Sequence, residues 1–200
     1  MQQLDLTLPS PAENLACEEA LLDSCEENGG EEIMRFWESP QAFVVVGYAN
    51  KVATEVNVAN CRAQGVPVLR RCSGGGTVLQ GVGCLNYALI LQITADGPLR
   101  SITSANQFIM ERNRAALQSL LPQVGIAVRG HTDLTLNGLK FSGNSQRRKR
   151  TFLLFHGTFL LNFNLQQVGE LLRMPSSEPD YRAHRSHADF LVNLQVPAEK

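Results

Sequence analysis

The spacing of apolar positions along the chain predicts two long helices. Over residues 13–27, apolar and small residues recur at helical spacing between acidic ones, and Gly29-Gly30 follow as a helix stop. The same spacing returns over residues 104–121 and ends at a Leu-Pro pair. We expect shorter helices over residues 58–64 and 165–172.

Runs rich in Val, Ile, Leu and Phe predict a sheet between these helices. Residues 42–47 are apolar enough for a strand buried on both faces, and the Asn137-Gly138 pair is typical of a hairpin turn. Because the strands come in runs, without regular alternation with helices, the pattern favours an α+β or mixed α/β fold over a Rossmann sheet. The remaining expected strands cover residues 35–37, 66–69, 87–93, 124–128, 133–141 and 151–163.

Length and composition narrow the class of protein. The chain has 200 residues, of which 44% are hydrophobic and 18% charged, so we expect one globular domain over 1–200 with an irregular, polar tail from about residue 175. No apolar run approaches the roughly 18 residues of a membrane span, and the first residues do not resemble a secretory signal. We therefore expect a soluble, cytoplasmic chain without a membrane partner.

Charge and cysteine usage add two expectations. Residues 1–38 hold ten acids and one base, whereas residues 39–200 hold nine acids and seventeen bases, so the body of the chain carries a charge of +8. Such a surface attracts acidic proteins, nucleotides or nucleic acid. The five cysteines form no C-x-x-C pair, which predicts reduced thiols rather than disulfides or a zinc site.

The segment from Arg70 to Val78 is the strongest candidate site. Gly74, Gly75 and Gly76 follow a predicted strand and permit a backbone that approaches a ligand and exposes amide groups to an anion. Arg70, Arg71 and Ser73, just before them, suit a carboxylate or phosphate. A purely structural glycine turn is the alternative, and the arginines favour an anion or acyl-nucleotide site.

Three further segments carry candidate chemistry. Lys140 precedes small and amide residues and could face a developing negative charge, although a solvated surface lysine is the simpler interpretation. The basic run 146–150 indicates a solvated hairpin turn first and a docking patch for an acidic protein second, with nucleic-acid binding disfavoured because no aromatic residue interleaves with it. His156 lies in an apolar segment and indicates a hydrogen-bonded core histidine. The chain has no P-loop, no G-x-S-x-G motif and no histidine spacing typical of metal ligands.

Taken in order, these segments resemble the lipoate-protein ligase and octanoyltransferase family, which shares a fold with biotin ligases. The similarity covers roughly residues 14–162. The matching residues are Asn14-Leu15-Ala16, Glu18-Glu19-Ala20-Leu21, Arg35-Phe36-Trp37, Val46-Gly47, Glu55-Val56-Asn57, Arg70 to Val78, Gly83, Leu85-Asn86-Tyr87, Asp133-Leu134, Lys140 with Ser142 to Gln146, and His156-Gly157-Thr158.

The resemblance implies a mixed sheet flanked by helices, with an acyl group in a tunnel beside the glycine loop. It also implies that Lys140 is catalytic and contacts the reacting carbonyl and its phosphate. Arg70, Ser73, Gly75 and Gly76 would line the acyl-adenylate, and Asn86 and Asp133 would border the nucleotide. The other implied binding residues are Gly74, Thr77, Ser142, Gly143, Asn144, His156, Gly157 and Thr158.

The activity implied is attachment of lipoate, through lipoyl-AMP made from ATP with Mg²⁺, to a lysine of a lipoyl carrier domain. The carrier would be a dehydrogenase E2 subunit, a glycine-cleavage H-like protein or another lipoate-binding protein. The alternative is octanoyl transfer from acyl carrier protein through a cysteine thioester. The ligase is favoured because no cysteine follows Lys140 and Val128 stands where another transferase subgroup has its nucleophile.

The chain departs from the family pattern in two ways. Gln80-Gly81 replaces a histidine-aspartate pair, and Gly83-Cys84 replaces a glycine-asparagine. The sequence after His156-Gly157-Thr158 is also too short for the accessory domain that many ligases carry, so a separate accessory chain is an expected partner. Residues 181–187 have no role that the sequence explains.

Overall fold

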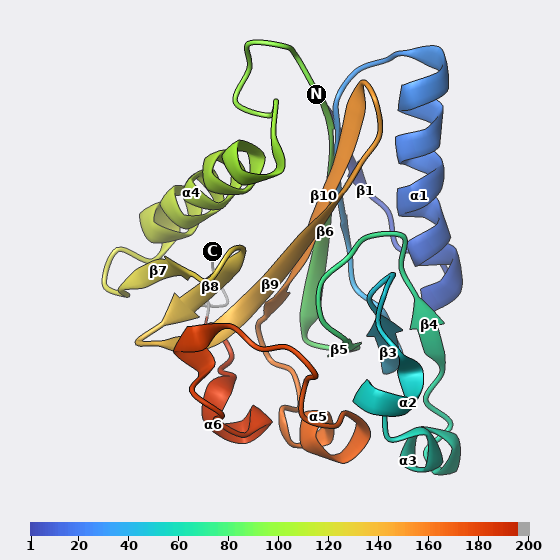
Figure 1. Ribbon diagram of the computed structural model, residues 1–200, viewed down its shortest axis with the longest axis vertical. Coiled ribbons are helices and arrows are strands. Elements are labelled where there is room, and N and C mark those ends of the chain that lie inside the picture. The colour runs from blue at the N-terminus through green and yellow to red at the C-terminus, as the bar shows by residue number, and fades with distance from the viewer. Residues whose placement is uncertain (196–200) are drawn as a thin grey trace.

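The computed structural model describes residues 1–195 and contains a large and a small β-sheet with helices around them (Figure 1). The large sheet has the strand order β1-β2-β6-β10-β9-β8-β7, with β1 parallel to β2 and all other neighbours antiparallel. The α+β class with a mixed sheet is therefore confirmed. The strands are β1 (Gln2–Asp5), β2 (Ile33–Trp37), β6 (Cys84–Gln92), β7 (Ile126–Arg129), β8 (Asp133–Leu136), β9 (Leu139–Arg148) and β10 (Phe152–Leu160).

The small sheet is formed by a stretch of chain inserted between two paired strands of the large one. Its order is β4 (Val68–Arg70), β3 (Phe43–Val46), β5 (Val78–Gln80), whereas β2 and β6, which precede and follow it, pair with each other. The insertion begins and ends at adjacent points, because a Cβ built on Gly81 would lie 3.1 Å from the Ala42 Cα. The glycine loop, residues 74–76, lies within this insertion.

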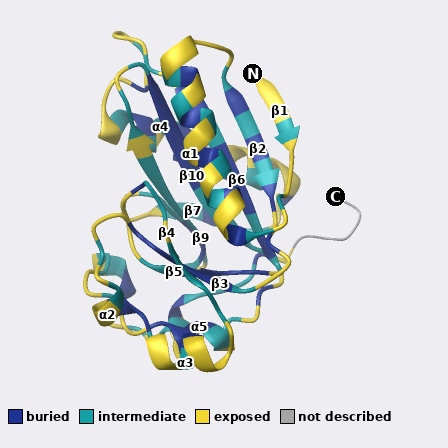
Figure 2. Ribbon diagram, turned by 90° about the vertical axis from the view of Figure 1, so that its right-hand side faces the viewer, coloured by how far each residue is buried: buried dark blue, intermediate teal, exposed yellow. Residues whose placement is uncertain are grey.

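Two long helices cover opposite faces of the large sheet (Figures 1 and 2). Helix α1 (Pro11–Asn28) buries Leu22 and Cys25 against β6 and β10, and α4 (Ile102–Leu120) packs Ile109 and Met110 into the other core. Serine caps, at Ser10 and Ser101, accept from the third backbone N–H of each helix and fix where it begins. Both predicted long helices are confirmed.

Short helices surround the small sheet and occupy the end of the chain. They are α2 (Val52–Glu55), α3 (Val58–Ala63), α5 (Gln166–Leu171), a 3₁₀ helix (Asp180–Arg182) and α6 (His187–Phe190). The last two lie in the tail, where composition alone did not indicate them. Within residues 1–195, no helix is both long and apolar enough to cross a membrane.

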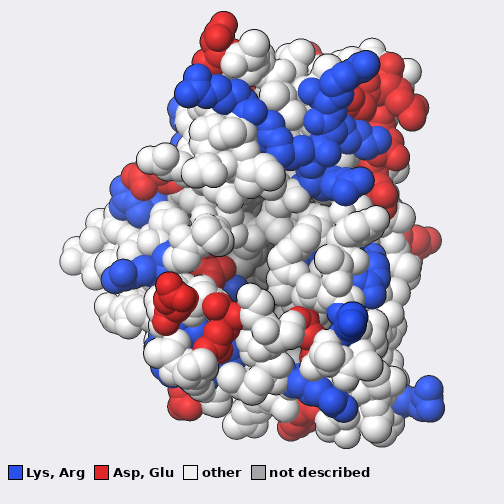
Figure 3. All heavy atoms as spheres, in the orientation of Figure 1, with Lys and Arg blue, Asp and Glu red and all other residues white. Residues whose placement is uncertain are grey.

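Two consecutive hairpins, β8–β9 and β9–β10, contain Asp133, Lys140 and His156. Asn137 and Gly138 adopt φ values of +51° and +80°, so the predicted turn joins β8 to β9. At the other end of β9, the expectation that the basic run 146–150 forms a hairpin turn is correct only for Lys149 and Arg150, because residues 146–148 belong to β9 itself. The Lys149 ammonium pairs with Asp23 at 2.6 Å. Figure 3 shows Lys and Arg side chains gathered on the upper part of one face, above a central hollow.

Candidate active site

A cavity of about 740 Å³ lies between the two sheets. One wall comes from the glycine loop and β5, the opposite wall from β6, β8, β9 and β10, and a third from the C-terminal segment, residues 173–191. Twelve predicted site residues line it, although they come from five separate stretches of the sequence. They are Gly75, Gly76, Thr77, Asn86, Asp133, Lys140, Ser142, Gly143, Asn144, His156, Gly157 and Thr158.

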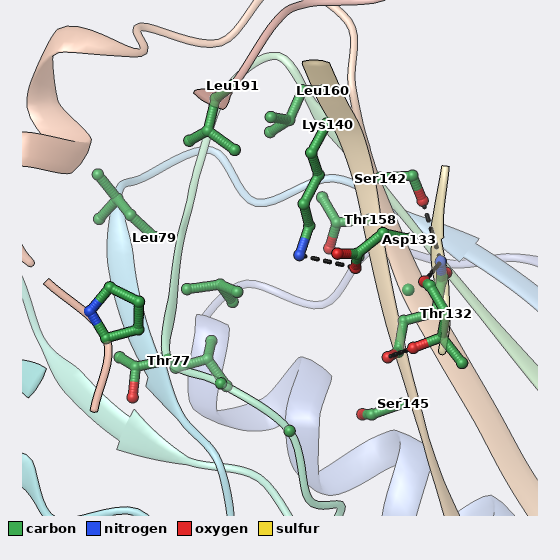
Figure 4. A pocket seen from close by; sticks show the side chains of 18 of the residues that line it. Thr77, Leu79, Thr132, Asp133, Lys140, Ser142, Ser145, Thr158, Leu160 and Leu191 are labelled. Atoms are coloured by element: carbon green, nitrogen blue, oxygen red, sulfur yellow. Dashed lines mark hydrogen bonds and ion pairs between the residues drawn. The ribbon is translucent and has the colours of Figure 1, made fainter. Parts of the chain in front are cut away.

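Lys140 points into this cavity with its charge already paired (Figure 4). Its Nζ lies 2.8 Å from the Asp133 Oδ1, and the two side chains are only 24% and 13% exposed. The strand register places Asp133 opposite Gly143, three residues after the lysine. A Cβ on Gly143 would lie 2.8 Å from both the Cε and the Nζ of Lys140. The lysine therefore reaches its partner by lying across a glycine.

The glycine loop is held in shape by Arg71 rather than by Arg70. The Arg71 Nη2 donates to the carbonyl oxygens of Gly74 (2.5 Å) and Gly76 (2.7 Å), and its Nε donates to the Ser73 Oγ (3.0 Å). Burial lowers the pKa of Arg71 to about 10, so the guanidinium is still charged at neutral pH. Because three of its donors serve the loop, it stabilises the loop's conformation and adds positive charge beneath it.

Three predicted residues do not line the cavity: Arg70, Ser73 and Gly74. The Arg70 Nη1 instead donates to the carbonyl oxygens of residues 47, 48 and 50, which tethers the loop after β3. Neighbouring residues on a strand point to opposite faces, so only one arginine of the pair can face the cavity, and it is Arg71. Ser73 is fully buried behind the wall.

Ser73 belongs to a buried chain of hydrogen bonds centred on His156. The His156 Nε2 lies 2.5 Å from the Ser73 Oγ, and its Nδ1 lies 2.5 Å from a carboxylate oxygen of Glu18. The Trp37 Nε1 donates to the other Glu18 oxygen at 2.7 Å. The prediction of a hydrogen-bonded, buried histidine is confirmed. These hydrogen bonds link α1, β2 and β10 to the glycine loop.

A second polar network forms the floor of the cavity on β6 and β10. The Thr158 hydroxyl donates to the Asn86 Oδ1 at 2.6 Å and accepts from the Gln80 Nε2 at 2.7 Å. Within residues 1–195, the Gln80 Oε1 is the one buried side-chain polar atom without a hydrogen-bond partner. The resemblance described above implies histidine at this position, and Gln80 places an acceptor at the cavity wall instead.

The Asn144 side chain is hydrogen-bonded within the protein, to one backbone group and to side chains. Its Nδ2 donates to the Thr132 carbonyl at 2.7 Å, and its Oδ1 accepts from the Tyr87 hydroxyl at 2.7 Å. A Cβ on Gly157 would lie 1.6 Å from that Oδ1, so the facing position has to be glycine. Asn144 thus fixes the turn that precedes Asp133.

The sequence analysis assigned no role to Glu55 or Tyr181, whose hydrogen bonds connect different walls of the cavity. Glu55 is buried and accepts hydrogen bonds from Asn50 (2.7 Å), from Ser176 (2.6 Å) and from Thr77. Burial on its own would raise the pKa of Glu55, but these hydrogen bonds lower it below its ordinary value. Tyr181 donates from its hydroxyl to the Asp133 Oδ2 at 2.7 Å. Glu55 stood inside a recognised motif, whereas Tyr181 gave no signal in the sequence.

Two apolar patches lie at different parts of the cavity wall. One lies under α1 beside the glycine loop, and the other lies beside β5 and the C-terminal segment. Lys140, Asp133 and the polar floor line the same cavity. This arrangement can hold an elongated ligand with an apolar end and a charged part. The first patch comprises Leu15, Trp37, Val45 and Val78, and the second includes Leu79, Leu160, Leu172 and Leu191.

Metal ligands and reactive thiols do not gather here. Within residues 1–195, no three His, Cys, Asp or Glu side chains are grouped so that they could hold a metal ion. All five cysteines are free, and none lines the cavity. Burial raises the pKa of Cys72 to about 11 and of Cys84 to about 12, so both remain thiols at neutral pH.

Comparison with known proteins gives consistent matches. The family model described as the lipoyl protein ligase A/B catalytic domain matches residues 10–197. A putative lipoate-protein ligase A of Aeropyrum pernix is 32% identical over 84% of this chain and 61% of its own length. An octanoyltransferase LipM of Clostridioides difficile is 26% identical over 86% of this chain and 69% of its own length. The chain spans only 56% to 61% of the first two ligase relatives.

Solved structures agree on the fold. A bipartite lipoate protein ligase of Thermoplasma acidophilum, described with its E2 lipoyl domain, superimposes with a TM-score of 0.81 at 23% identity over 99% of this chain and 77% of that one. A lipoate-protein ligase A bound with ATP gives 0.78 at 22% identity over 96% of this chain and 75% of that one. At such identities the similarity shows the fold alone.

Proposed function

Because the chain belongs to the lipoyl protein ligase A/B catalytic domain family, we propose that it attaches lipoate, through a lipoyl-adenylate, to a lysine of a lipoyl carrier domain. The observation that carries the proposal is the Lys140 ammonium, which is paired with Asp133 in one cavity that is also lined by apolar patches and by polar side chains. An acyl-adenylate has parts that match these: an apolar acyl chain, a charged mixed anhydride and a nucleotide.

Each part of the ligand has a proposed place. The acyl chain lies against the patch under α1, beside the glycine loop, and the mixed anhydride lies at Lys140. At an effective dielectric constant near 20, an ammonium about 4 Å from an oxyanion stabilises it by roughly 4 kcal/mol. That interaction strengthens as charge develops on the carbonyl and phosphate oxygens, so it favours the transition state.

ATP and lipoate are the proposed substrates. Relatives named lipoate-protein ligase, and a structural neighbour that binds ATP, support this assignment. Mg²⁺ is proposed as the partner of the ATP phosphates. It commonly uses only one or two protein carboxylates beside phosphate oxygens, so the lack of a three-ligand cluster in residues 1–195 is compatible with it. Asp133 is the carboxylate nearest to the proposed phosphate position, since it pairs with Lys140.

The alternative is octanoyl transfer through a cysteine thioester, which is supported by the LipM relatives. A cysteine nucleophile has to reach the acyl carbonyl as a thiolate. None of the five cysteines lines the cavity, and Cys72 and Cys84 have raised pKa values. The cavity therefore supports the adenylate route over the thioester route.

One assay separates the two reactions. The chain is incubated with an apo lipoyl domain and either ATP, Mg²⁺ and lipoate or octanoyl acyl carrier protein, and the carrier is weighed by mass spectrometry. We expect a lipoyl adduct in the first mixture. An octanoyl adduct in the second mixture alone would identify a transferase. Carriers to compare are an E2 lipoyl domain, a glycine-cleavage H-like protein and other lipoate-binding proteins.

We further propose that a separate accessory chain supports the adenylation half of the reaction. Two observations support this: the resemblance implies histidine where this chain has Gln80, and the Thermoplasma neighbour is described as bipartite. The isolated chain should therefore transfer a supplied lipoyl-adenylate to the carrier much faster than it releases pyrophosphate from ATP and lipoate. Equal rates of the two half-reactions would show that no partner is needed.

A further inference from the structure

We propose that Tyr181 is a positioning residue for Lys140 and acts through the carboxylate of Asp133. The inference rests on the proposed function, in which Lys140 contacts the reacting group. It assigns a role to the segment after residue 180, which no sequence motif explains.

Both oxygens of Asp133 are engaged, each by a different partner. The Lys140 ammonium lies 2.8 Å from Oδ1, and the Tyr181 hydroxyl donates to Oδ2 at 2.7 Å. Burial and the charge of Asp133 raise the pKa of Tyr181, so the phenol stays protonated and remains a donor. With one oxygen held by the phenol, the other oxygen faces the ammonium in one orientation.

Tyr181 is itself fixed to the hairpin that carries the other two residues. It lies in the 3₁₀ turn Asp180–Arg182, where the Arg185 Nη2 donates to the carbonyl oxygens of Tyr181 (2.9 Å) and Gly138 (3.2 Å). Gly138 is in the turn between β8 and β9, the strands of Asp133 and Lys140. The guanidinium of Arg182 lies 4.6 Å from the centre of the Phe190 ring and anchors the same turn.

The main chain of Lys140 is also held by a hydrogen bond. The Val192 N–H donates to the Lys140 carbonyl at 3.0 Å, so the residue that directly follows the C-terminal segment binds the main chain of the lysine. A lysine side chain is a flexible stem with a compact charge, and its placement depends on what it is paired with. Here the pairing carboxylate of Asp133 is oriented by Tyr181, which lies 48 positions later in the chain.

The first test is Tyr181→Phe, which removes only the hydroxyl. We expect kcat for carrier lipoylation to fall about tenfold, as for the loss of one hydrogen bond to a charged group, while the KM for ATP and the thermal midpoint stay unchanged. Tyr48→Phe is the matched control, because Tyr48 is 61% exposed and lies outside the cavity lining. A loosened segment would instead raise the KM for ATP and lower the midpoint, which would overturn the proposal.

The decisive test places Tyr181→Phe in an Asp133→Ala background. If Tyr181 acts only through Asp133, the second substitution has no further effect, whereas a separate role would give the same tenfold loss again. Should the background be too slow to assay, the cycle is repeated on the affinity for a sulfamoyl analogue of the acyl-adenylate. Additive losses overturn the positioning role. A wild-type chain that lipoylates no carrier even from supplied lipoyl-adenylate refutes the proposed function itself.

Discussion

Gly143→Ala should separate activity from stability more cleanly than any substitution of a charged residue. The added methyl group would start 2.8 Å from the Lys140 Cε and Nζ, and ordinary contact begins at 3.4 Å. The ammonium is the flexible end of a side chain, so it moves, whereas the strand does not. Gly143 does not have a positive φ, so alanine fits its backbone.

The size of the effect follows from this geometry. The ammonium has to recede by at least the difference between 2.8 and 3.4 Å and lies then at a less favourable position for both Asp133 and the substrate. A misplacement of about 1 Å in a catalytic group costs up to about 10²-fold in rate. We therefore expect kcat to fall by about 10- to 100-fold. The stability of the fold should stay the same or rise by about 0.5 kcal/mol, because glycine is unfavourable inside a strand.

The assay measures carrier lipoylation from supplied lipoyl-adenylate together with the urea midpoint of the same preparation. Gly125→Ala is the control: a Cβ there meets nothing within 4 Å, and the residue lies outside the cavity lining. Wild-type turnover in Gly143→Ala would refute the claim that Lys140 acts from its position across this glycine. A large loss of stability would refute the claim that the side chain yields rather than the strand.

Three other predictions address different parts of the site. Lys140→Met should lower turnover by about 10² to 10³-fold with little change in thermal midpoint, and a variant that keeps more than half of wild-type turnover would exclude the assignment. Replacing Cys72 and Cys84 together by serine should leave lipoylation within about twofold of wild type, since an adenylate route needs no thiolate; an octanoyl thioester trapped on Cys84 would favour the transferase. Glu55→Gln should destabilise the chain by about 1–3 kcal/mol at neutral pH. Because the pKa of Glu55 is lowered in the folded state, this difference is complete above its ordinary pKa of 4.5 and fades as the pH falls through the lowered value, so unfolding curves that stay equally far apart in acid would contradict it.

The sequence predicted the local parts of the site well. Local pattern indicated the glycine loop, whereas the lysine segment and the histidine-glycine-threonine were implied as site residues only by the family resemblance; all three segments contribute residues to the cavity lining. The resemblance implied that Arg70 lines the site, whereas Arg71 lines the cavity; the choice depends on which face of β4 meets the large sheet. A shift of one residue reverses that choice.

Contacts between segments far apart in the sequence could not be predicted from the local pattern. Glu18 reaches His156 across 138 residues, and Ser176 reaches Glu55 across 121. Tyr181 is an ordinary residue in a polar tail of the sequence, and only the folded chain shows that Arg185 links its turn to Gly138. A single sequence holds no local signal for such pairings, because their free energy depends on the folded arrangement of the strands.

The insertion that forms the small sheet has an implication for how such sites diversify. Residues 43–80 leave and rejoin the large sheet at adjacent points and carry the glycine loop, whereas the lysine, its aspartate and the tyrosine all belong to the sheet that remains or to the segment docked on it. The glycine-loop wall and the lysine-bearing wall therefore come from different stretches of the chain, joined by the hydrogen bonds of Ser73 with His156, Gln80 with Thr158 and Glu55 with Ser176. A chimera that exchanges residues 43–80 with those of a relative would change one wall of the cavity and keep the other, so the range of accepted acyl chains could be altered by recombination without rebuilding the lysine and the residues that position it.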